Sequence, residues 1–400
     1  MASGVRKTKS TSTLAQDLEP EYITIRPDSQ KAWVTLQENN AIAEIDLVTK
    51  TISDIWALGT KDISLPGNGM DISDNNNEVL IANWPIQAYY IPDAVANYTV
   101  NGTTYLVMAN EGDEKEYAGL TERTTVGANT YTLDPAIFPN ASVLKQNHNA
   151  GRLRVTNLNG NTDADADFEE IKILGSRSFS IFNADTKAIV FDSGDDFEMY
   201  TAMTPSISPI FNADHGDNVK KGRSRAKGPE PEGVTLTQIA GKTFAFITLE
   251  RVGGVMVYDV TNPSDVKFVD YKNSRSTSAY SGDFGPEGVT FIKAADSPNN
   301  KNYVAIANEI SGTISMYEVN TANLTNDDFV HAPKTFTVFP NPSTKGVVYF
   351  NRMASYSLYD LTGKLIQSEK NALLINTSKL TAGMYLIQTD EGLTQKLVVK

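Results

Sequence analysis

The stretch Glu230-Pro231-Glu232-Gly233-Val234 decides the fold, because close copies of it return along the chain. The copies are Glu19-Pro20-Glu21-Tyr22-Ile23, Gly285-Pro286-Glu287-Gly288-Val289 and the weaker Pro92-Asp93-Ala94-Val95. A second glutamate ends the next run of apolar and β-branched residues, 17 to 22 positions after the first carboxylate: Glu38, Glu111, Glu250 and Glu309. Self-similarity of this kind predicts a repeat architecture.

The copy around residue 230 reveals the repeating unit. Runs typical of strands cover residues 233–238, 243–249, 255–260 and 266–271, and glycine or Asn-Pro turns separate them. Four antiparallel strands in about 40–45 residues form one blade of a β-propeller. A β-sandwich would not explain the repeated motif, and a β-helix repeat would be much shorter. The sequence therefore predicts an all-β chain with a β-propeller.

About five blades can be counted, at residues 17–56, 92–158, 171–200, 229–271 and 285–330. Long insertions lie between them at 58–90 and 200–228. Propellers close with four to eight blades, so a ring of five is allowed.

Composition and charge argue against several classes of function. The 400 residues contain no cysteine, which excludes thiol nucleophiles and zinc–thiolate sites, and the net charge of −13 disfavours binding to nucleic acid. No apolar run is long enough for a transmembrane segment. From Lys334 onward there are eight basic and four acidic residues, a net of +4, so the first 333 residues carry −17. This shift predicts a flexible segment at 1–16, a propeller at 17–331 and a separate domain at 335–400.

The repeated carboxylates are the main candidate site. Each pair lies at the open end of one predicted hairpin, so ring symmetry would gather them around one mouth of the channel. Packed carboxylates repel each other unless a cation lies between them, and oxygen-rich sites suit calcium. We therefore predict calcium as a cofactor, although the same residues are also explained as caps of backbone amides. The predicted metal ligands are Glu21, Glu38, Asp93, Glu111, Glu232, Glu250, Glu287 and Glu309.

Two other features carry candidate residues. Asp163, Asp165 and Asp167 alternate along an acidic loop that lacks the glycine and glutamate of an EF-hand. It is either a short calcium loop or a solvated turn. Arg251 and Arg177 are candidates for binding an anionic group, and surface salt bridges explain them equally well. The G-x-S-x-G, P-loop and H-E-x-x-H motifs are absent, so no nucleophile or general base is identified.

Several stretches resemble the choice-of-anchor I family of secreted bacterial proteins. The most specific are Lys227-Gly228-Pro229-Glu230-Pro231-Glu232-Gly233 and Leu249-Glu250-Arg251-Val252-Gly253-Gly254, joined by Ala109-Asn110-Glu111-Gly112-Asp113. The resemblance covers about residues 15–320. It implies a β-propeller of a kind often described as alkaline-phosphatase-like or phytase-esterase-like. Members usually have further propeller sequence upstream, so we expect the ring to be truncated at its N-terminus.

The C-terminal region resembles a type IX secretion sorting domain. Its motifs are Phe339-Pro340-Asn341-Pro342, then Leu358-Tyr359-Asp360-Leu361-Thr362-Gly363-Lys364, then Leu380-Thr381-Ala382-Gly383-Met384-Tyr385. Alternating strands with Asp-Leu-Thr-Gly turns predict a small β-sandwich. The resemblance implies export through the periplasm and across the outer membrane of Bacteroidota-type bacteria, with the secretion machinery as partner. The first 15 residues lack the apolar core of a signal peptide.

Two classes of function follow for this secreted or cell-surface protein. One is a calcium-dependent phosphoesterase, in which the metal polarises a phosphoryl oxygen and Arg251 or Arg177 holds a phosphorylated small-molecule substrate. The other is a non-catalytic extracellular binding or adhesion module with structural calcium.

Overall fold

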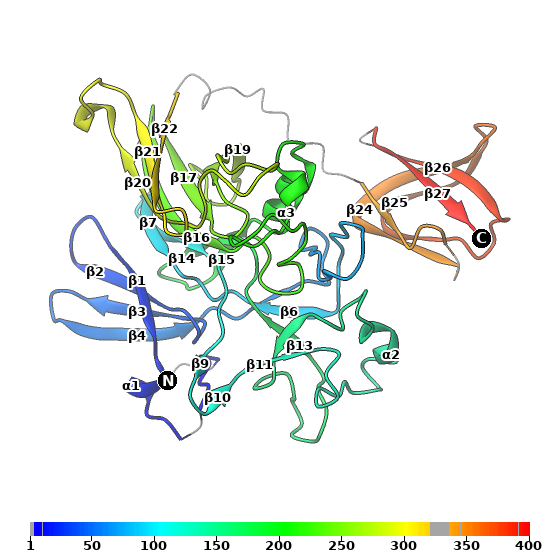
Figure 1. Cartoon of the computed structure of the whole chain (residues 1–400), viewed down its shortest axis with the longest axis horizontal. Coiled ribbons are helices and arrows are strands. Elements are labelled where there is room, and N and C mark those ends of the chain that lie inside the picture. The colour runs from blue at the N-terminus through cyan, green and yellow to red at the C-terminus, as the bar shows by residue number, and fades with distance from the viewer. Residues whose placement is uncertain (1–3, 10, 321–335, 344–345, 391) are drawn as a thin grey trace.

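The computed structural model describes residues 4–9, 11–320, 336–343, 346–390 and 392–400 (Figure 1). Four antiparallel sheets follow one another in the described chain, each with its strands in sequence order from one edge to the other. They are the blades of a β-propeller. The predicted domain boundary at residues 331–335 lies outside the described residues.

Three blades have four strands and the last has three described strands. Blade 1 contains β1 (Pro20–Ile25), β2 (Lys31–Leu36), β3 (Ala41–Asp46) and β4 (Thr51–Ala57). Blade 2 contains β7 (Val95–Val100), β8 (Thr103–Ala109), β14 (Phe179–Asn183) and β15 (Ile189–Asp192). Blade 3 contains β16 (Pro231–Ile239), β17 (Lys242–Leu249), β18 (Val255–Asp259) and β19 (Lys267–Lys272). Blade 4 contains β20 (Pro286–Ile292), β21 (Tyr303–Asn308) and β22 (Thr313–Glu318).

The blades pack face to face through apolar cores. Trp33 and Phe182 lie in the core between blades 1 and 2, and Phe179 and Tyr258 lie in the core between blades 2 and 3. Phe246 belongs to the core between blades 3 and 4. Because β17 is covered on both faces, its sequence is a continuous apolar run rather than an alternating one. The first strands β1, β7, β16 and β20 contact one another in that order, which brings the repeated motifs together.

The number of blades differs from the prediction. The two blades predicted at 92–158 and 171–200 are one blade, because β8 pairs with β14 across the segment between Ala109 and Phe179. The predicted strand at the start of the second, β13 (Ile171–Leu174), pairs instead in parallel with β6 (Ile86–Tyr89), which also pairs with β5 (Thr60–Asp62). The spacing of strands along the sequence could not predict this pairing, because a long insertion separates β8 from β14, its direct neighbour in the sheet.

The insertions contain short elements around their own core. In the insertion between β8 and β14, β9 (Glu116–Tyr117) pairs with β10 (Leu120–Thr121), and β11 (Arg123–Thr125) pairs with β12 (Arg154–Thr156). The helices are short: α1 (Leu14–Asp17), α2 (Ala141–Leu144), α3 (Asp196–Met203) and the 3₁₀ turns η1 (Ser208–Ile210) and η2 (Ala294–Asp296). Among the described residues, no helix has the length and apolar character needed to cross a membrane.

Part of the segment that the sequence analysis assigned as flexible, residues 1–16, packs against the propeller. Val5 and Arg6 are buried, and Arg6 forms an ion pair with the fully buried Glu122. The Arg6 guanidinium also donates to the Glu38 carbonyl oxygen at 2.7 Å.

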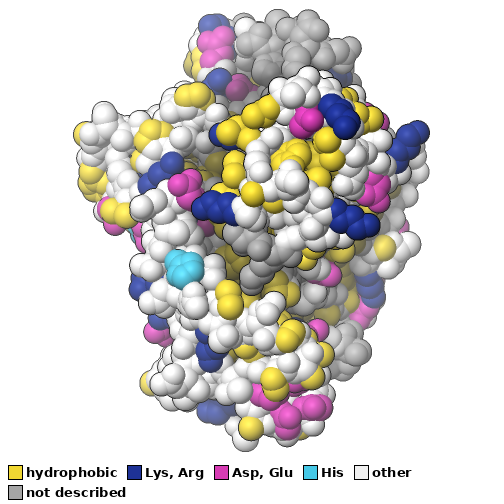
Figure 2. Space-filling view, turned by 90° about the vertical axis from the view of Figure 1, so that its right-hand side faces the viewer, with side chains coloured by type: hydrophobic (Ala, Val, Ile, Leu, Met, Phe, Trp, Pro, Cys, Tyr) yellow, Lys and Arg dark blue, Asp and Glu magenta, His cyan; other side chains and the backbone are white. Residues whose placement is uncertain are grey.

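The C-terminal region forms a separate five-stranded sheet that curls around its own core, in a sandwich-like or barrel-like arrangement. Its strands are β23 (Val338–Phe339), β24 (Val347–Asp360), β25 (Leu365–Asn376), β26 (Gly383–Thr389) and β27 (Thr394–Val399). The long strand β24 pairs with β23, β25 and β26. Leu361, Leu365 and Leu386 are exposed. Figure 2 views the molecule from this side and shows hydrophobic side chains gathered between Lys and Arg side chains.

Candidate functional site

In three of the four blades, a β-bulge places the first carboxylate of the motif, whereas Asp93 of blade 2 precedes its strand. In blade 3, Pro231 pairs with Leu249 and Val234 with Ile247, so Glu232 and Gly233 together face one residue of β17. The bulges of β1 and β20 contain Glu21 and Glu287 in the same way. A bulge bends its strand and re-aims the side chains within it. The repeated motif therefore encodes one backbone feature that turns a carboxylate away from the regular ladder.

A threonine on the partner strand holds this bulge in two blades. The Gly233 amide donates to the Thr248 hydroxyl at 2.8 Å, and the Tyr22 amide donates to the Thr35 hydroxyl at 2.8 Å. The Thr35 hydroxyl also donates to the carbonyl oxygen of Asp93 at 2.7 Å, which links blade 1 to the motif of blade 2. A Cβ at Gly233 would overlap the Glu287 carbonyl oxygen of blade 4, so the close approach of the two blades requires glycine here.

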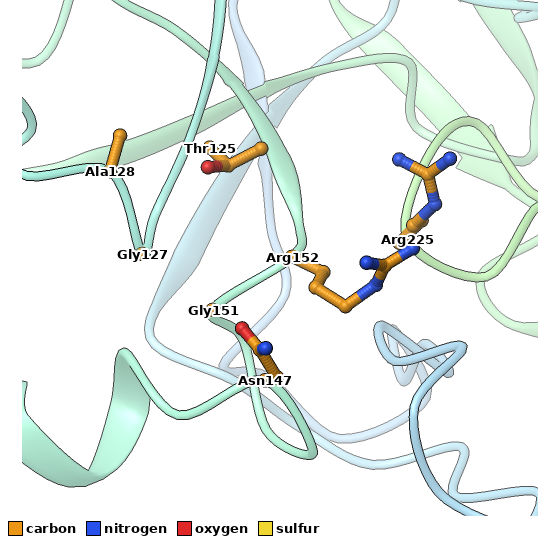
Figure 3. Close-up of a pocket in the computed structure, with 7 residues that line it drawn as sticks. All are labelled: Thr125, Gly127, Ala128, Asn147, Gly151, Arg152 and Arg225. Atoms are coloured by element: carbon orange, nitrogen blue, oxygen red, sulfur yellow. The ribbon is translucent and has the colours of Figure 1, made fainter.

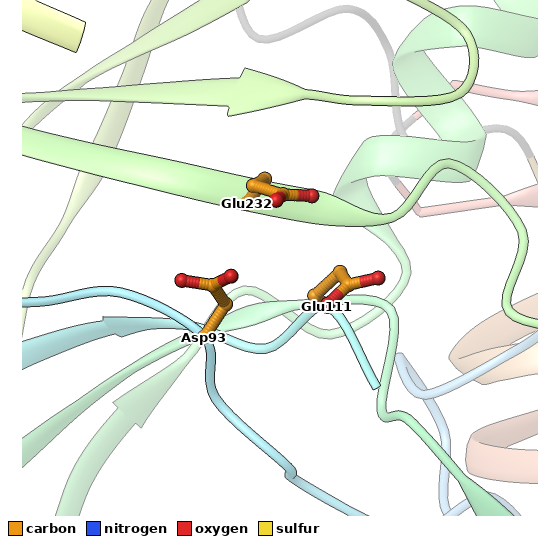
Figure 4. A group of neighbouring side chains, drawn as sticks. All are labelled: Asp93, Glu111 and Glu232. Carbon is orange, nitrogen blue, oxygen red and sulfur yellow. The ribbon is translucent and has the colours of Figure 1, made fainter. Parts of the chain in front are cut away.

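Three carboxylates from two blades meet next to this bulge. Asp93 precedes β7, Glu111 follows β8, and Glu232 lies on β16; one oxygen from each falls within 4.8 Å of the others. Figure 4 shows Glu232 on one strand, across from Asp93 and Glu111. Oxygens that bind one calcium ion at 2.3–2.6 Å lie at most about 5 Å apart. The arrangement has the dimensions of a calcium site.

A second group shares Glu111 with the first. Glu111, Glu230 and Glu250 also bring carboxylate oxygens within 4.8 Å of one another, but here cations lie among them. Lys227 Nζ lies 2.9 Å from Glu111 Oε1 and 3.2 Å from Glu230 Oε2. Arg223 also pairs with the fully buried Glu230. This half of the cluster is an ion-pair network.

The pKa values separate the two halves. Burial, with Lys227, Arg223 and Arg251 opposing it, leaves the pKa of Glu230 well below its usual range, so Glu230 is ionised. Burial and the neighbouring carboxylates of Glu111 and Glu250 raise the pKa of Glu232 to about 11. Burial, followed by nearby carboxylates, raises the pKa of Asp93 to about 7. Burial also raises the pKa of Glu111 well above its usual range, although Lys227 opposes this shift. Burial therefore favours the protonated form of Asp93, Glu111 and Glu232 when no cation is bound.

Neither Asp93 nor Glu232 contacts a Lys or Arg side chain among the described residues. A hydrogen bond joins their two carboxyl groups. The Oε2 atom of Glu232 is buried without a hydrogen-bond partner in the described chain. An orphaned buried oxygen is costly and marks a position where an unseen ligand fits.

The other predicted metal ligands lie outside this group of three carboxylates. Glu38 is buried near Glu19 and Asp113, and burial with the Glu19 charge raises its pKa to about 8. Glu287 and Glu309 are exposed and hydrogen-bond each other, and Glu21 is also exposed. Glu250 lies in the ion-pair half of the cluster, where His215 Nδ1 lies 3.0 Å from its Oε1 atom. The structure thus brings together Asp93, Glu111, Glu232 and Glu250 out of the eight.

Both candidate arginines are engaged in internal contacts. Arg177 is buried, and its terminal nitrogens contact Glu198 Oε1 at 2.5 Å and the carbonyl oxygens of Asp71, Ser224 and Ala226 at 2.7–2.8 Å. The Nε atom of Arg251 lies 2.9 Å from Glu230 Oε2 and 3.1 Å from Glu250 Oε2. Arg177 therefore holds backbone segments together, and Arg251 neutralises the carboxylate cluster.

The acidic loop forms two overlapping groups. Asp163 and Asp165 lie within 4.8 Å of Glu169, whereas Asp167 groups with Asp134 and Glu169. Backbone amides already occupy part of these oxygens: the Asp167 amide donates to Asp165 Oδ1 at 2.8 Å. Both alternatives, a short calcium loop and a solvated acidic turn, stay predictions for this loop.

Sequence reasoning missed the cations of the cluster. Lys227 and Arg223 come from the insertion before blade 3, and Glu230 stands two positions before Glu232. The repeated motif could have indicated Glu230, because Glu19 occupies the equivalent position in the motif of blade 1. Nothing in the repeat indicated Lys227 or Arg223, which have no counterparts in the other copies.

Two relatives are similar in sequence. A mesenchyme-specific cell surface glycoprotein from Strongylocentrotus purpuratus is 26% identical over 339 residues, which cover 77% of this chain and 41% of that protein. Gigasin-3a from Magallana gigas is 23% identical over 185 residues, which cover 42% of this chain and 64% of that protein. The chain thus spans less than two thirds of the length of either relative.

Among solved structures, the chain resembles the β-propeller domain of Cps50 (Swd1) from Myceliophteria thermophila. The identity is 7%, the TM-score is 0.21, and the match covers 94% of this chain and 96% of that domain.

Two family models divide the chain. The secretion system C-terminal sorting domain matches residues 337–400, so the chain is a secreted or cell-surface protein. The choice-of-anchor I domain matches residues 1–263, which is more than half of the chain. The chain therefore belongs to the choice-of-anchor I domain family.

Proposed function

We propose that this chain is an extracellular binding module whose propeller holds one structural calcium ion between blades 2 and 3. The observation that carries the proposal is the pair Asp93 and Glu232, which come from different blades, contact no Lys or Arg among the described residues and share a hydrogen bond. Calcium prefers carboxylate oxygens and accepts irregular geometry. In this position the ion would join the two blades at their open ends.

The charge of the cluster supports a divalent cation. Its five carboxylates are Asp93, Glu111, Glu230, Glu232 and Glu250. Three cations contact this set, namely Lys227, Arg223 and Arg251. Five carboxylates against three cations leave two negative charges, and Asp113 and Asp214, which pair with the same cations, add further negative charge. One calcium ion would balance two of these charges. The ion would also remove the need to keep protons on Asp93 and Glu232 at neutral pH.

The non-catalytic role is favoured over a phosphoesterase. A phosphoesterase of the predicted kind needs a cationic group free to hold the phosphate, next to the metal. The terminal nitrogens of Arg177 are all engaged, and Arg251 and Lys227 are shared among carboxylates. The name of the sea urchin relative, a cell surface glycoprotein, supports a role at a surface.

Titration calorimetry of the full chain with calcium tests this proposal. After chelator treatment, the parent should bind calcium with a stoichiometry that Asp93→Asn and Glu232→Gln each reduce by one site. Glu116→Gln is the matched control, because Glu116 is exposed and makes the same change of charge. Asp165→Asn reports separately on the acidic loop. Unchanged calcium binding in both Asp93→Asn and Glu232→Gln would refute the proposed site.

A chromogenic phosphate ester separates the two functions. The non-catalytic module should show no calcium-dependent hydrolysis of the ester above the level seen with chelator. Calcium-dependent turnover that Glu232→Gln abolishes would favour the phosphoesterase instead.

A further inference from the structure

A polar cavity of about 260 Å³ lies away from the carboxylate cluster, beside the pair of strands β11 and β12 (Figure 3). Three segments that are distant in sequence form its wall: the end of β11, the loop before β12 and the insertion before blade 3. The lining residues are Thr125, Gly127, Ala128, Asn147, Gly151, Arg152 and Arg225. The proposed calcium site uses none of them.

Backbone packing keeps one wall of this cavity free of side chains. The Gly127 amide donates to the Gly151 carbonyl oxygen at 2.8 Å, and a Cβ at Gly127 would lie only 2.6 Å from that oxygen. Thr125 and Asn147 provide the neighbouring polar side chains (Figure 3). Within the described chain, neither the Thr125 hydroxyl nor the Asn147 amide has a hydrogen-bond partner. The Thr125 hydroxyl and the Asn147 amide are therefore available to a ligand, beside a wall formed by glycine backbone.

Two guanidinium groups share one carboxylate at the edge of the cavity. Asp74 accepts from Arg152 Nε at 2.7 Å and from a terminal nitrogen of Arg152 at 2.9 Å. Arg225 Nε lies 2.8 Å from Asp74 Oδ2. Among the described residues, the two terminal nitrogens of Arg225 have no acceptor. These two nitrogens form a fork that matches the two oxygens of a carboxylate or phosphate group.

The surroundings add further positive charge. Arg154 on β12 donates its backbone amide to the Arg225 carbonyl oxygen at 2.9 Å, and its side chain has no ion-pair partner in the described chain. Burial and the nearby guanidinium groups of Arg223 and Arg123 lower the pKa of Arg154. Like charges held together in this way repel each other. Their concentration here stands out because the first 333 residues carry a net charge of −17.

We propose that this cavity binds a small hydroxylated molecule that carries a carboxylate or phosphate group, of the size of an acidic sugar. The terminal nitrogens of Arg225 take the anionic group beside the Arg152–Asp74 pair, while Thr125 and Asn147 bind hydroxyl groups. The volume lies just below the range of about 300–1,000 Å³ for pockets that hold drug-sized ligands, so the occupant is small. The positive charge selects against neutral sugars.

Calorimetry on the full chain tests this proposal, with glucuronate, glucose 6-phosphate, inorganic phosphate and glucose as probes at low ionic strength in the presence of chelator. At least one acidic sugar should bind at a single saturable site, more tightly than inorganic phosphate, and glucose should not bind. Arg225→Gln should weaken this binding about tenfold or more, because it removes charge-assisted hydrogen bonds. Arg26→Gln is the matched control, since among the described residues the Arg26 side chain pairs only with Asp28, on the exposed turn after β1.

A neutral variant covers the case in which Arg225→Gln fails to fold. Asn147→Ala should weaken the binding of the acidic sugar and leave the binding of inorganic phosphate unchanged. The proposal is overturned if no probe binds saturably, if glucose binds as tightly as the acidic sugars, or if Arg26→Gln weakens binding as much as Arg225→Gln. Inorganic phosphate that binds as tightly as glucose 6-phosphate overturns the assignment of a hydroxylated ligand.

Discussion

When calcium is absent, the replacement Glu232→Gln should remove the fall in folding stability that this carboxyl group causes as pH rises. Glu232 has a pKa raised to about 11 in the folded protein by burial and by the carboxylates of Glu111 and Glu250. An unfolded glutamate has a pKa of about 4.3. The folded state therefore keeps a proton at neutral pH that the unfolded state releases, so folding stability falls as pH rises above the unfolded value.

The size of the effect follows from this difference. Each retained proton costs about 1.4 kcal/mol per pH unit. Between pH 5 and pH 7 the Glu232 proton alone should lower the free energy of unfolding by about 3 kcal/mol. That corresponds to roughly 5–10 °C in the melting temperature of a domain of this size. Glutamine mimics the protonated side chain, so the variant should exceed the stability of the parent by about 1 kcal/mol at pH 5 and by a margin about 3 kcal/mol larger at pH 7.

Thermal and urea unfolding of parent and variant across pH 5–8 in chelator measures the difference directly. Saturating calcium should remove the pH dependence of the parent, because the ion displaces the proton, and at 100 times the dissociation constant it should add about 2.7 kcal/mol. The variant should lose most of this gain. Parallel pH profiles for parent and Glu232→Gln, or an equal change in the Glu116→Gln control, would refute the reasoning.

Two further predictions concern other parts of the chain. Arg177→Met should lower the free energy of unfolding in urea by about 3–5 kcal/mol, because it leaves the buried Glu198 carboxylate unpaired, whereas Arg26→Met should change it little. Removal of residues 334–400 should leave the melting temperature of the propeller unchanged and abolish release to the cell surface, since the core of the C-terminal domain contains residues of that domain alone. A truncated protein that still reaches the surface would contradict the assigned role of the sorting domain.

The sequence predicted the parts of the fold that are contiguous. Blades 1 and 3 have strands joined by short turns, so the alternation of strands and turns reads directly as a four-stranded sheet. Blade 2 could not be read this way, because a long insertion enters between β8 and β14. A hydrophobic run marks a strand but does not identify its partner, and the insertion made two half-blades look like two blades.

The candidate site was predictable to a similar degree. The repeated motif identified Asp93, Glu111 and Glu232, because a hairpin returns its two ends to one place and the ring gathers the hairpins. It did not reveal which carboxylates are neutralised. That depends on Lys227 and Arg223, whose position is set by the irregular path of an insertion and not by any periodic pattern.

One backbone stretch connects the two proposed sites. Residues 223–227 supply Arg223 and Lys227 to the carboxylate cluster and Arg225 to the anion cavity. Arg177 holds this stretch in place, because its guanidinium group donates hydrogen bonds to the carbonyl oxygens of Ser224 and Ala226. Its partner Glu198 in turn accepts the Asp71 amide at 2.7 Å, three residues before Asp74. Arg177 thus acts by positioning rather than by binding a ligand, and its loss should disturb both sites together, whereas Glu232→Gln and Arg225→Gln should each affect one.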